Sequence, residues 1–488
     1  MKWLFFLCLL STFLRLDAQK RGLGYGHHTG SDLRAISSGV SWWYNWYHLP
    51  DAGVRANYQD FNVQFVPMAW NGAFDRDGLY DFLTNNPQID YLLGFNEPNF
   101  TDQANMTPSE AAAVWPELEA LADEFNLKLV GPAVNFCGDC VSENGVNYSD
   151  PVEYLDAFFD ECVDCRVDYI AVHWYGCGGL EWYLDLFKKY DRPLWVTEIA
   201  CWDQENISLD QQKRFLIDAV ELMENDPNVF RYAWFTGRGN GPHISILGST
   251  GQLTELGELY VNMPVHDTTQ YLQLPAKIEA ENYQKTDGAQ LELTTDTDGL
   301  IQLSHLDVGD WVEYQVDVQS SRSFTFDLRY AANRSGKLSI TVDDKSTFTI
   351  DLLSTGGWGK WRTLPSEIEL STGEHVIRLE VLQSGFNLNW IAILEERPPV
   401  LSSPEIADLA VYPNPSSKAI RLVPGHFEVR NTLVITAIDG REVLRQTDCE
   451  RADLQQIDIS SWQPGIYIAI FSVSGSSPQV SKFIRTTY

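Results

Sequence analysis

Two glutamates in this chain each close a short apolar run, as a carboxylate does at the end of a buried strand. Glu97 follows the run at 91–95 and the intervening Asn96, and Glu198 follows the run at 194–197. Side chains at the carboxyl ends of parallel barrel strands share one mouth. Two carboxylates there suit glycoside hydrolysis, in which one protonates the leaving oxygen and the other attacks the anomeric carbon. The pair predicts a sugar-cleaving enzyme that needs no cofactor for catalysis, although either glutamate alone would also suit a solvated strand end.

Further side chains at the same predicted strand ends could hold a sugar. Asn96 is a candidate for binding a 2-hydroxyl, and His173 is a candidate for orienting a carboxylate. Aromatic rings stack on the C–H faces of sugars, and the candidates near strand ends are Trp46, Trp70, Trp174, Tyr175, Trp202 and Trp234. The alternative is a packed aromatic cluster in which His173 is bonded to the backbone. We expect about half of Trp46, Trp70, Trp202 and Trp234 to line a cleft.

Eight apolar runs must position these side chains. They cover residues 22–25, 40–46, 64–70, 91–95, 128–134, 169–175, 194–199 and 232–236. Helical patterns lie between several of them, for example at 108–125 and 209–224. The first of these helices has a strong start, with Thr107 as the cap, Pro108 in the first turn and Glu110 as the capping glutamate. Residues 19–264 are therefore predicted to form a (β/α)8 TIM barrel, with a doubly wound sheet as the alternative.

The composition of the whole chain limits its partners. Its 488 residues carry a formal net charge of -32, which would repel nucleic acid and an anionic membrane surface. Residues 1–18, with Lys2 before an apolar stretch and Ala18 at the end, have the pattern of a secretory signal peptide. No later run approaches the ~18 apolar residues of a membrane helix. We expect a secreted or cell-surface monomer, without membrane insertion, that meets neutral polymer.

Seven cysteines remain after the predicted cleavage, and all but one lie in the first domain: Cys137, Cys140, Cys162, Cys165, Cys177, Cys201 and Cys449. An exported protein permits disulfides. The two Cys-x-x-Cys pairs also allow a zinc site as the alternative. Cys177 and Cys201 follow different predicted strands, so a bridge between them could cross the barrel mouth. Cys449 is predicted to be a free thiol.

Several motifs of the first domain, in order over residues 20–262, resemble those of glycoside hydrolase family 128. They include Leu-Gly-Phe-Asn-Glu-Pro at 93–98, Val-His-Trp-Tyr-Gly at 172–176 and Trp-Val-Thr-Glu at 195–198. Shorter matches lie at 20–23, 41–46 and 65–68. The resemblance implies a retaining endo-β-1,3-glucanase on a barrel, acting on a laminarin- or curdlan-like β-1,3-glucan. It also implies that Glu97 is the acid/base and Glu198 the nucleophile.

Residues 274–397 have a different pattern, with short alternating strands separated by glycine-rich turns. This pattern predicts a β-sandwich, which we expect to be a jelly roll. The segments 278–283, 308–314, 356–358 and 386–391 resemble carbohydrate-binding module family 6.

That resemblance implies a sugar-binding cleft and a structural calcium site in the sandwich. The residues matching the cleft are Glu292, Trp358 and Asn387, while His305 stands where the family has a second aromatic ring. Trp311 is either part of a second cleft or a structural residue. Glu279 and Glu281 match the calcium ligands, and oxygen-only ligands suit this ion. Surface strand carboxylates are the alternative for this pair.

The end of the chain comprises a stiff linker at 398–404 and a small all-β domain at 405–488. The domain opens with Val-Tyr-Pro-Asn-Pro at 411–415 and resembles the C-terminal sorting domain of the bacterial type IX secretion route. The resemblance implies the type IX machinery as a partner. Two other functions remain as alternatives to the secreted glucanase: a non-catalytic β-glucan-binding protein, and an adhesin that uses the sandwich domain.

Overall fold

The computed structural model describes residues 20–204, 206–395, 409–424, 427, 431–450, 452–473 and 478–487. They belong to two compact units, residues 1–395 and 396–488, each of which is described by itself. The predicted signal peptide at 1–18 and the linker at 398–404 lie outside the described residues.

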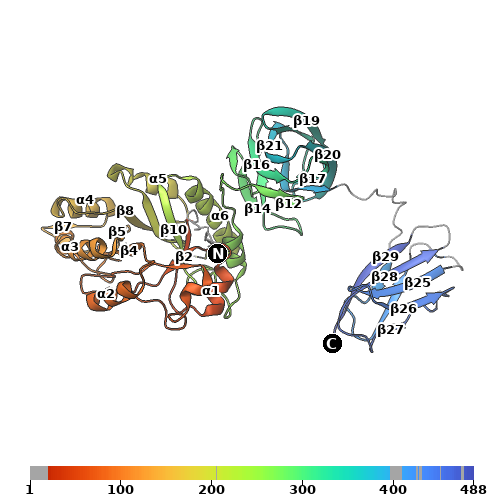
Figure 1. The fold of residues 1–488 in the computed structure, drawn as a ribbon, viewed down its shortest axis with the longest axis horizontal. Helices are drawn as coiled ribbons and strands as arrows, with labels where there is room; N and C mark the ends of the chain where they lie inside the picture. Colours follow the sequence, from red (N-terminus) through yellow and green to blue (C-terminus); the bar gives the residue numbers. More distant parts are fainter. Residues whose placement is uncertain are drawn as a thin grey trace, which may run out of the picture. The chain divides into compact units, whose positions relative to one another are not determined.

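The first part of unit 1 is a curled, TIM-like parallel sheet (Figure 1). Each predicted run overlaps one of its strands, although β1 begins one residue and β10 three residues before the predicted run. The strands are β1 (Arg21–Gly24), β2 (Trp42–Tyr44), β3 (Gln64–Phe65), β4 (Tyr91–Leu93), β5 (Lys128–Val134), β8 (Tyr169–Trp174), β9 (Leu194–Ile199) and β10 (Val229–Phe235). The order is β3-β2-β1-β10-β9-β8-β5-β4, so sheet neighbours follow one another along the chain. A doubly wound sheet would instead reverse its order, and this alternative is wrong.

The two edge strands of this sheet are also bonded to each other. Leu93 in β4 donates its N–H to the oxygen of Pro67, at 3.0 Å, and accepts from the N–H of Ala69, at 2.9 Å. Because Pro67 and Ala69 directly follow β3, these bonds bring the ends of the strand order together. All eight carboxyl ends therefore face one mouth.

Helices surround the sheet (Figure 1). They are α1 (Gly30–Ile36), α2 (Arg76–Asn85), α3 (Pro108–Phe125), α4 (Pro151–Glu161), α5 (Leu180–Asp185), α6 (Leu209–Asn225) and α7 (Glu255–Asn262), with a small hairpin of β6 (Ser142–Glu143) and β7 (Val146–Asn147). The predicted start of α3 is confirmed. Thr107 and Glu110 form a reciprocal capping box around Pro108.

Large side chains fill the interior of the curled sheet. Successive residues of a strand point to opposite faces, so Trp42 and Tyr44 lie inside with Trp195, whereas Trp43 packs against the helices. The Arg231 guanidinium lies 5.0 Å from the centre of the Trp195 ring. The interior is thus a packed core, and the mouth at the carboxyl ends is left to hold a ligand.

The second part of unit 1 consists of two mostly antiparallel sheets. One contains β11 (Leu272–Leu274), β13 (Lys285–Asp287), β16 (Trp311–Val318), β18 (Gly336–Val342), β19 (Lys345–Leu352) and β21 (Gly373–Gln383). The other contains β12 (Ala276–Glu279), β14 (Gln290–Leu293), β15 (Ile301–Ser304), β17 (Arg322–Ala332), β20 (Trp361–Leu370) and β22 (Phe386–Glu395). Side chains along β16 are alternately buried and half-buried, as the sequence pattern predicts. The jelly-roll connectivity stays a prediction.

A polar cluster fixes the segment between the barrel and these sheets to α6. Glu221 of α6 accepts from His266 Nε2 at 2.9 Å and from the Tyr283 hydroxyl at 2.5 Å. The His266 and Tyr283 rings are stacked, with centroids 4.2 Å apart. We refer to Glu221, His266 and Tyr283 as the α6 clamp.

Unit 2 is all-β in the part that the structure describes. One sheet has β23 (Ala410–Tyr412), β24 (Ala419–Val423) and β27 (Ile457–Asp458), and the other has β25 (Asn431–Ala437), β26 (Glu442–Thr447), β28 (Gly465–Val473) and β29 (Gln479–Arg485). Cys449 is buried in this unit as a free thiol, as predicted. Among the described residues of the chain, no helix has the length and apolar character to cross a membrane.

Candidate active site

Glu97 lies just beyond β4, in a backbone conformation that non-glycine residues rarely adopt. Its φ is 44°, and the residue is 8% exposed. Neighbouring bonds hold this turn, because Asn96 N–H donates to the Trp70 oxygen at 2.9 Å and Phe100 N–H donates to the Glu97 oxygen at 3.0 Å. Strained backbone of this kind is often found at functional sites.

Glu198 lies in β9, and hydrogen-bond donors surround its buried carboxylate. Its Oε1 accepts from the Trp46 indole N–H at 2.7 Å and from the Tyr44 hydroxyl at 3.0 Å. The Tyr175 hydroxyl donates to Oε2. Burial raises the pKa of Glu198, and the Glu97 charge adds to this effect, whereas His173 and the Tyr175 hydroxyl oppose it. The donors fix the orientation of a carboxylate that burial would otherwise leave unpaired.

His173 links the two carboxylates. Its Nδ1 lies 2.9 Å from Glu97 Oε1 and 3.5 Å from Glu198 Oε2. Burial opposes a charge on the imidazole, but the carboxylates of Glu198 and Glu97 outweigh burial and raise the pKa of His173. One oxygen from each glutamate and a His173 nitrogen all lie within 4.8 Å of one another. The predicted pair therefore meets in space, and the predicted histidine joins it.

The same three side chains lie close enough together to be the ligands of a metal ion. However, the His173 nitrogen that faces the carboxylates lies at hydrogen-bond distance from Glu97. An imidazole that carries a proton on Nδ1 has no lone pair there for a metal. His173 is therefore hydrogen-bonded to Glu97 and lies next to Glu198.

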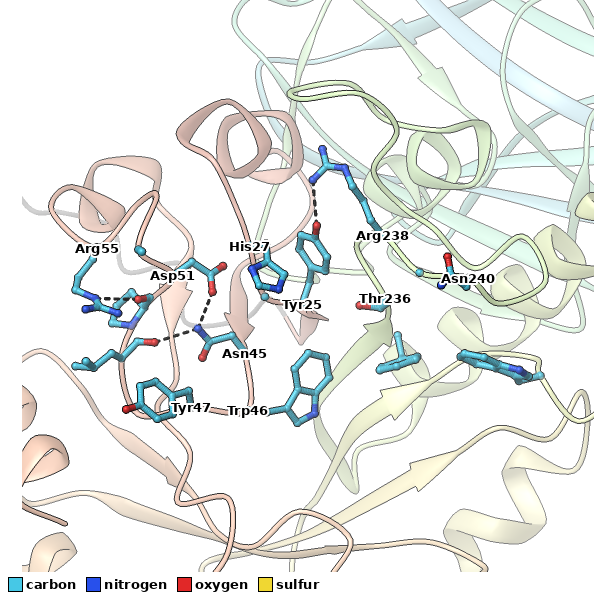
Figure 2. A pocket seen from close by; sticks show the side chains of 17 residues that line it. Tyr25, His27, Asn45, Trp46, Tyr47, Asp51, Arg55, Thr236, Arg238 and Asn240 are labelled. Atoms are coloured by element: carbon cyan, nitrogen blue, oxygen red, sulfur yellow. Dashed lines mark hydrogen bonds between the residues drawn. The ribbon is translucent and has the colours of Figure 1, made fainter. Parts of the chain in front are cut away.

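A cavity of about 700 Å³ lies beside Trp46, and neither glutamate is among the residues that line it (Figure 2). Trp46 contributes to its wall and, through its indole N–H, contacts Glu198. Figure 2 shows Arg238 bonded to the Tyr25 hydroxyl on one side of this cavity and Asn45 bonded to Asp51 on another. The walls combine aromatic faces with polar groups, as sugar-binding sites do.

Some of the other predicted barrel residues lie at the site, and others do not. Asn96 and Trp70 lie beside Glu97, and Asn96 Oδ1 is buried with no hydrogen-bond partner among the described residues. Trp174 points away from the glutamates and stacks on Tyr183, with centroids 4.5 Å apart. Trp202 lines the cavity, as does Trp46.

Trp234 differs from its expected place. Its side chain is completely buried, packs between Phe215 of α6 and Tyr260 of α7, and donates its N–H to the Ile244 oxygen. The residue is on the outer face of β10, because strand residues alternate in direction. Its neighbour Phe235 lines the cavity instead.

Two aromatic site residues were missed by sequence reasoning, Tyr44 and Phe235. Tyr44 donates to Glu198, and Phe235 packs against Trp46, Tyr175 and Trp202 at centroid distances of 5.8, 5.6 and 5.7 Å. The period of two in β2 could have placed Tyr44 on the same face as Trp42.

The barrel domain contains three disulfides. The pairs are Cys137–Cys140, Cys162–Cys165 and Cys177–Cys201. The disulfide prediction is confirmed for all six cysteines, including the bridge between the segments after β8 and β9, and the zinc alternative is wrong.

In the sandwich, the predicted cleft residues share one end of a sheet. Trp358 is 49% exposed, and its loop bonds back to Ala332, which pairs with Phe386 beside Asn387. Glu292 of β14 is exposed and accepts from Gln302 at 3.3 Å. Trp311 lies on another sheet, where the Arg378 guanidinium is 3.9 Å from the centre of its ring.

The predicted calcium ligands fit an oxygen-seeking ion. Glu279 and Glu281 each have one buried carboxylate oxygen that no donor in the described chain contacts. Burial raises the pKa of Glu281 to about 8. Glu279 also contacts Lys277 Nζ at 2.7 Å. A bound cation would relieve the burial cost of these oxygens.

Three family models match the chain in sequence. Residues 22–260 match the glycosyl hydrolase catalytic core, residues 279–395 match carbohydrate binding module family 6, and residues 410–485 match a secretion system C-terminal sorting domain. The chain is thus a glycoside hydrolase with a carbohydrate-binding module, and its sorting domain indicates secretion or a cell-surface location.

Relatives identify the hydrolase family. A solved GH128 (subgroup II) endo-β-1,3-glucanase from Pseudomonas viridiflava is 43% identical, covering 50% of this chain and 98% of that chain with a TM-score of 0.47. Another from Sorangium cellulosum is 46% identical, covering 51% of this chain and 100% of that chain with a TM-score of 0.46. This sequence identity extends over nearly the whole length of both relatives. It shows that the chain belongs to glycoside hydrolase family 128.

A curated relative is more distant. The alkali-sensitive linkage protein 1 of Schizosaccharomyces pombe is 28% identical over 258 residues, which are 50% of this chain and 44% of that protein. The chain spans less than half the length of the curated relatives that it matches.

Proposed function

We propose that the chain is a retaining endo-β-1,3-glucanase that hydrolyses laminarin- or curdlan-like glucans. The observation that carries the retaining mechanism is that one oxygen of Glu97 and one oxygen of Glu198 lie within 4.8 Å of each other. Retaining enzymes hold their carboxyl groups about 5–5.5 Å apart, whereas inverting enzymes need about 6.5–9.5 Å for a water molecule. The two solved relatives described as endo-β-1,3-glucanases support the linkage.

Glu198 acts as the nucleophile. Its carboxylate attacks the anomeric carbon and forms a glycosyl-enzyme, while Glu97 gives its proton to the departing oxygen. The Trp46 and Tyr44 donors hold Oε1, and Tyr175 holds Oε2, so the carboxylate is oriented before the substrate arrives. His173 provides a positive charge between the two acids.

Glu97 then reverses its role. Having lost its proton, it takes one from water, which attacks the glycosyl-enzyme and releases the sugar with its original anomeric configuration. Asn96 Oδ1, buried and without a partner in the described chain, accepts a hydrogen bond from a sugar hydroxyl beside Glu97. Trp46, Trp70 and Tyr175 contact the sugar rings.

The test is product release from laminarin, lichenan and carboxymethyl-cellulose. We expect short oligosaccharides from laminarin, first formed as the β-anomer, and a loss of at least about 10³-fold in Glu97→Gln and Glu198→Gln. Glu117→Gln, on the surface of α3, is the matched control and keeps full activity. A first-formed α-anomer would refute retention, and no release from laminarin by folded protein would refute the β-1,3 linkage.

We also propose that Glu279 and Glu281 hold a structural calcium ion in the sandwich. Calcium then raises the unfolding temperature of the full chain, and chelation lowers it by about 2–4 °C. The Glu279→Gln/Glu281→Gln variant is expected to lose this response in a thermal scan. An equal response in the variant and the parent would place the ion elsewhere.

The sorting domain is proposed to direct the chain through the type IX route. Removal of residues 396–488 is expected to abolish release into the medium, which immunoblotting of cell and medium fractions measures. Equal release without these residues would refute this route.

A further inference from the structure

Two exposed aromatic rings lie parallel on the barrel. Phe136 is 39% exposed and Trp182 is 56% exposed. Their planes differ by 3°, and their centroids are 6.1 Å apart. Large apolar side chains that stay exposed side by side often mark a binding surface. Neither ring is needed by the glutamates, which other side chains already hold.

Both rings belong to the mouth of the barrel. Phe136 lies two residues beyond β5, and Trp182 lies in α5, the helix that follows β8. Tyr183 joins them to the strand ends: its ring lies 5.7 Å from Phe136, and its hydroxyl donates to the Val134 oxygen at 3.3 Å. Trp174, the last residue of β8, stacks on the same Tyr183 ring.

The Phe136 loop is hydrogen-bonded to the Glu97 loop. Asn99, two residues after Glu97, is completely buried and donates its side-chain N–H to the Asn135 oxygen at 2.8 Å. The Asn99 backbone oxygen accepts from Val141 N–H at 2.9 Å. The Phe136 loop is therefore joined to the loop of the acid/base, whereas Trp46, which lines the cavity, is bonded to the nucleophile.

This division matches the two halves of a double displacement. The nucleophile bonds to the sugar that stays on the enzyme, and the acid/base protonates the oxygen of the part that leaves. We propose that Phe136 and Trp182 form a stacking platform for the leaving glucosyl units of the β-1,3-glucan. This assignment rests on the proposed glucanase function.

The chemistry of the platform suits a neutral sugar. A pyranose presents C–H groups on its face, and aromatic rings bind that face without a charge. The rigid side chains lose little conformational entropy when they bind. The Cys137–Cys140 bridge, next to Phe136, further restrains its loop.

A pair of substrates separates this role from a structural one. Laminarihexaose places glucosyl units on the leaving side, whereas β-laminaribiosyl fluoride leaves only fluoride there. In the full chain, Trp182→Ala is expected to lower kcat/KM for laminarihexaose about tenfold and to leave kcat/KM for the fluoride within about twofold. Trp182→Phe should restore most of the hexaose activity, because it keeps a ring.

The control variant is Tyr80→Ala, which removes an exposed ring from α2 and should change neither value. Equal losses on both substrates, or no loss with laminarihexaose, would overturn the platform. If the parent enzyme cleaves neither substrate, the proposed glucanase function fails instead, so the two failures are distinguishable.

Discussion

At the scale of single residues, the site depends on one basic side chain placed between two acidic ones. His173 lies at hydrogen-bond distance from Glu97 and 3.5 Å from Glu198, with its ring completely buried. Its charge offsets part of the effect of burial on the nucleophile. The two glutamates and this histidine could be predicted from the sequence because each ends an apolar run. The bond from Tyr44 to Glu198 could not be predicted. The period of two places Tyr44 on the same face as Trp42, but nothing in the run of aromatic residues at 42–46 distinguishes a hydrogen-bond donor from a packed ring.

Replacing the histidine tests this charge. In His173→Gln the pKa of Glu198 should rise, because the imidazole of His173 lowers this pKa and the substitution removes it. The acidic limb of the pH profile of kcat/KM then moves to higher pH, and activity at pH 6 falls about 10- to 100-fold. Tyr44→Phe, which removes a neutral donor instead, should move the limb less. An unmoved limb in His173→Gln would contradict the electrostatic role.

At the scale of elements, strand ends and caps were predictable, whereas contacts between distant elements were not. The sequence predicts the start of α3 because its capping residues, Thr107, Pro108 and Glu110, lie close together in the chain. The α6 clamp joins Glu221 to His266 and Tyr283, which are far apart in sequence and become neighbours only through the fold. Trp234 and Phe235 show the same limit, because the direction of each side chain depends on strand register.

The α6 clamp makes stability depend on pH. Burial opposes the charge of His266, but the Glu221 carboxylate outweighs it and raises the pKa of His266. Burial also opposes the Glu221 charge, yet hydrogen bonding to His266 and Tyr283 lowers its pKa. The stabilisation that His266 contributes is complete below its unfolded pKa of about 6.5. It is lost as pH rises through the pKa of His266 in the folded state. The Glu221 contribution is present above about 4.3 and is lost as pH falls through its folded value.

The clamp therefore contributes most between about pH 4.3 and 6.5. Glu221→Gln should lower the free energy of unfolding by about 1–3 kcal/mol at pH 6 and by less at pH 9. Denaturant unfolding at the two pH values measures this difference. Glu258→Gln, in α7, is the control. The same loss at both pH values would show that the ion pair adds nothing beyond hydrogen bonding.

At the scale of the whole molecule, a catalytic domain is connected to a module in which two of the predicted cleft residues, Trp358 and Glu292, are exposed. The order of the domains and their all-β or mixed character could be predicted, because strand period and turn composition change between segments. Which cleft of the sandwich binds sugar could not, since His305 replaces an expected aromatic ring.

A substrate-dependent effect should reveal the module. Trp358→Ala in the full chain should lower hydrolysis of insoluble curdlan about five- to tenfold, because the enzyme is no longer retained on the particle. Hydrolysis of soluble laminarihexaose should stay within about twofold. Trp311→Ala is the matched comparison for the second cleft. If Trp311→Ala alone reduces curdlan hydrolysis, the other sheet carries the binding.

The Cys177–Cys201 bridge joins residues on either side of α5 and encloses Glu198 in the loop that it closes. A secreted enzyme meets peptidases, and the surface between α5 and β9 is a natural place for a cut. After such a nick the two fragments would still be one covalent molecule, so the strand carrying the nucleophile would stay attached to its barrel.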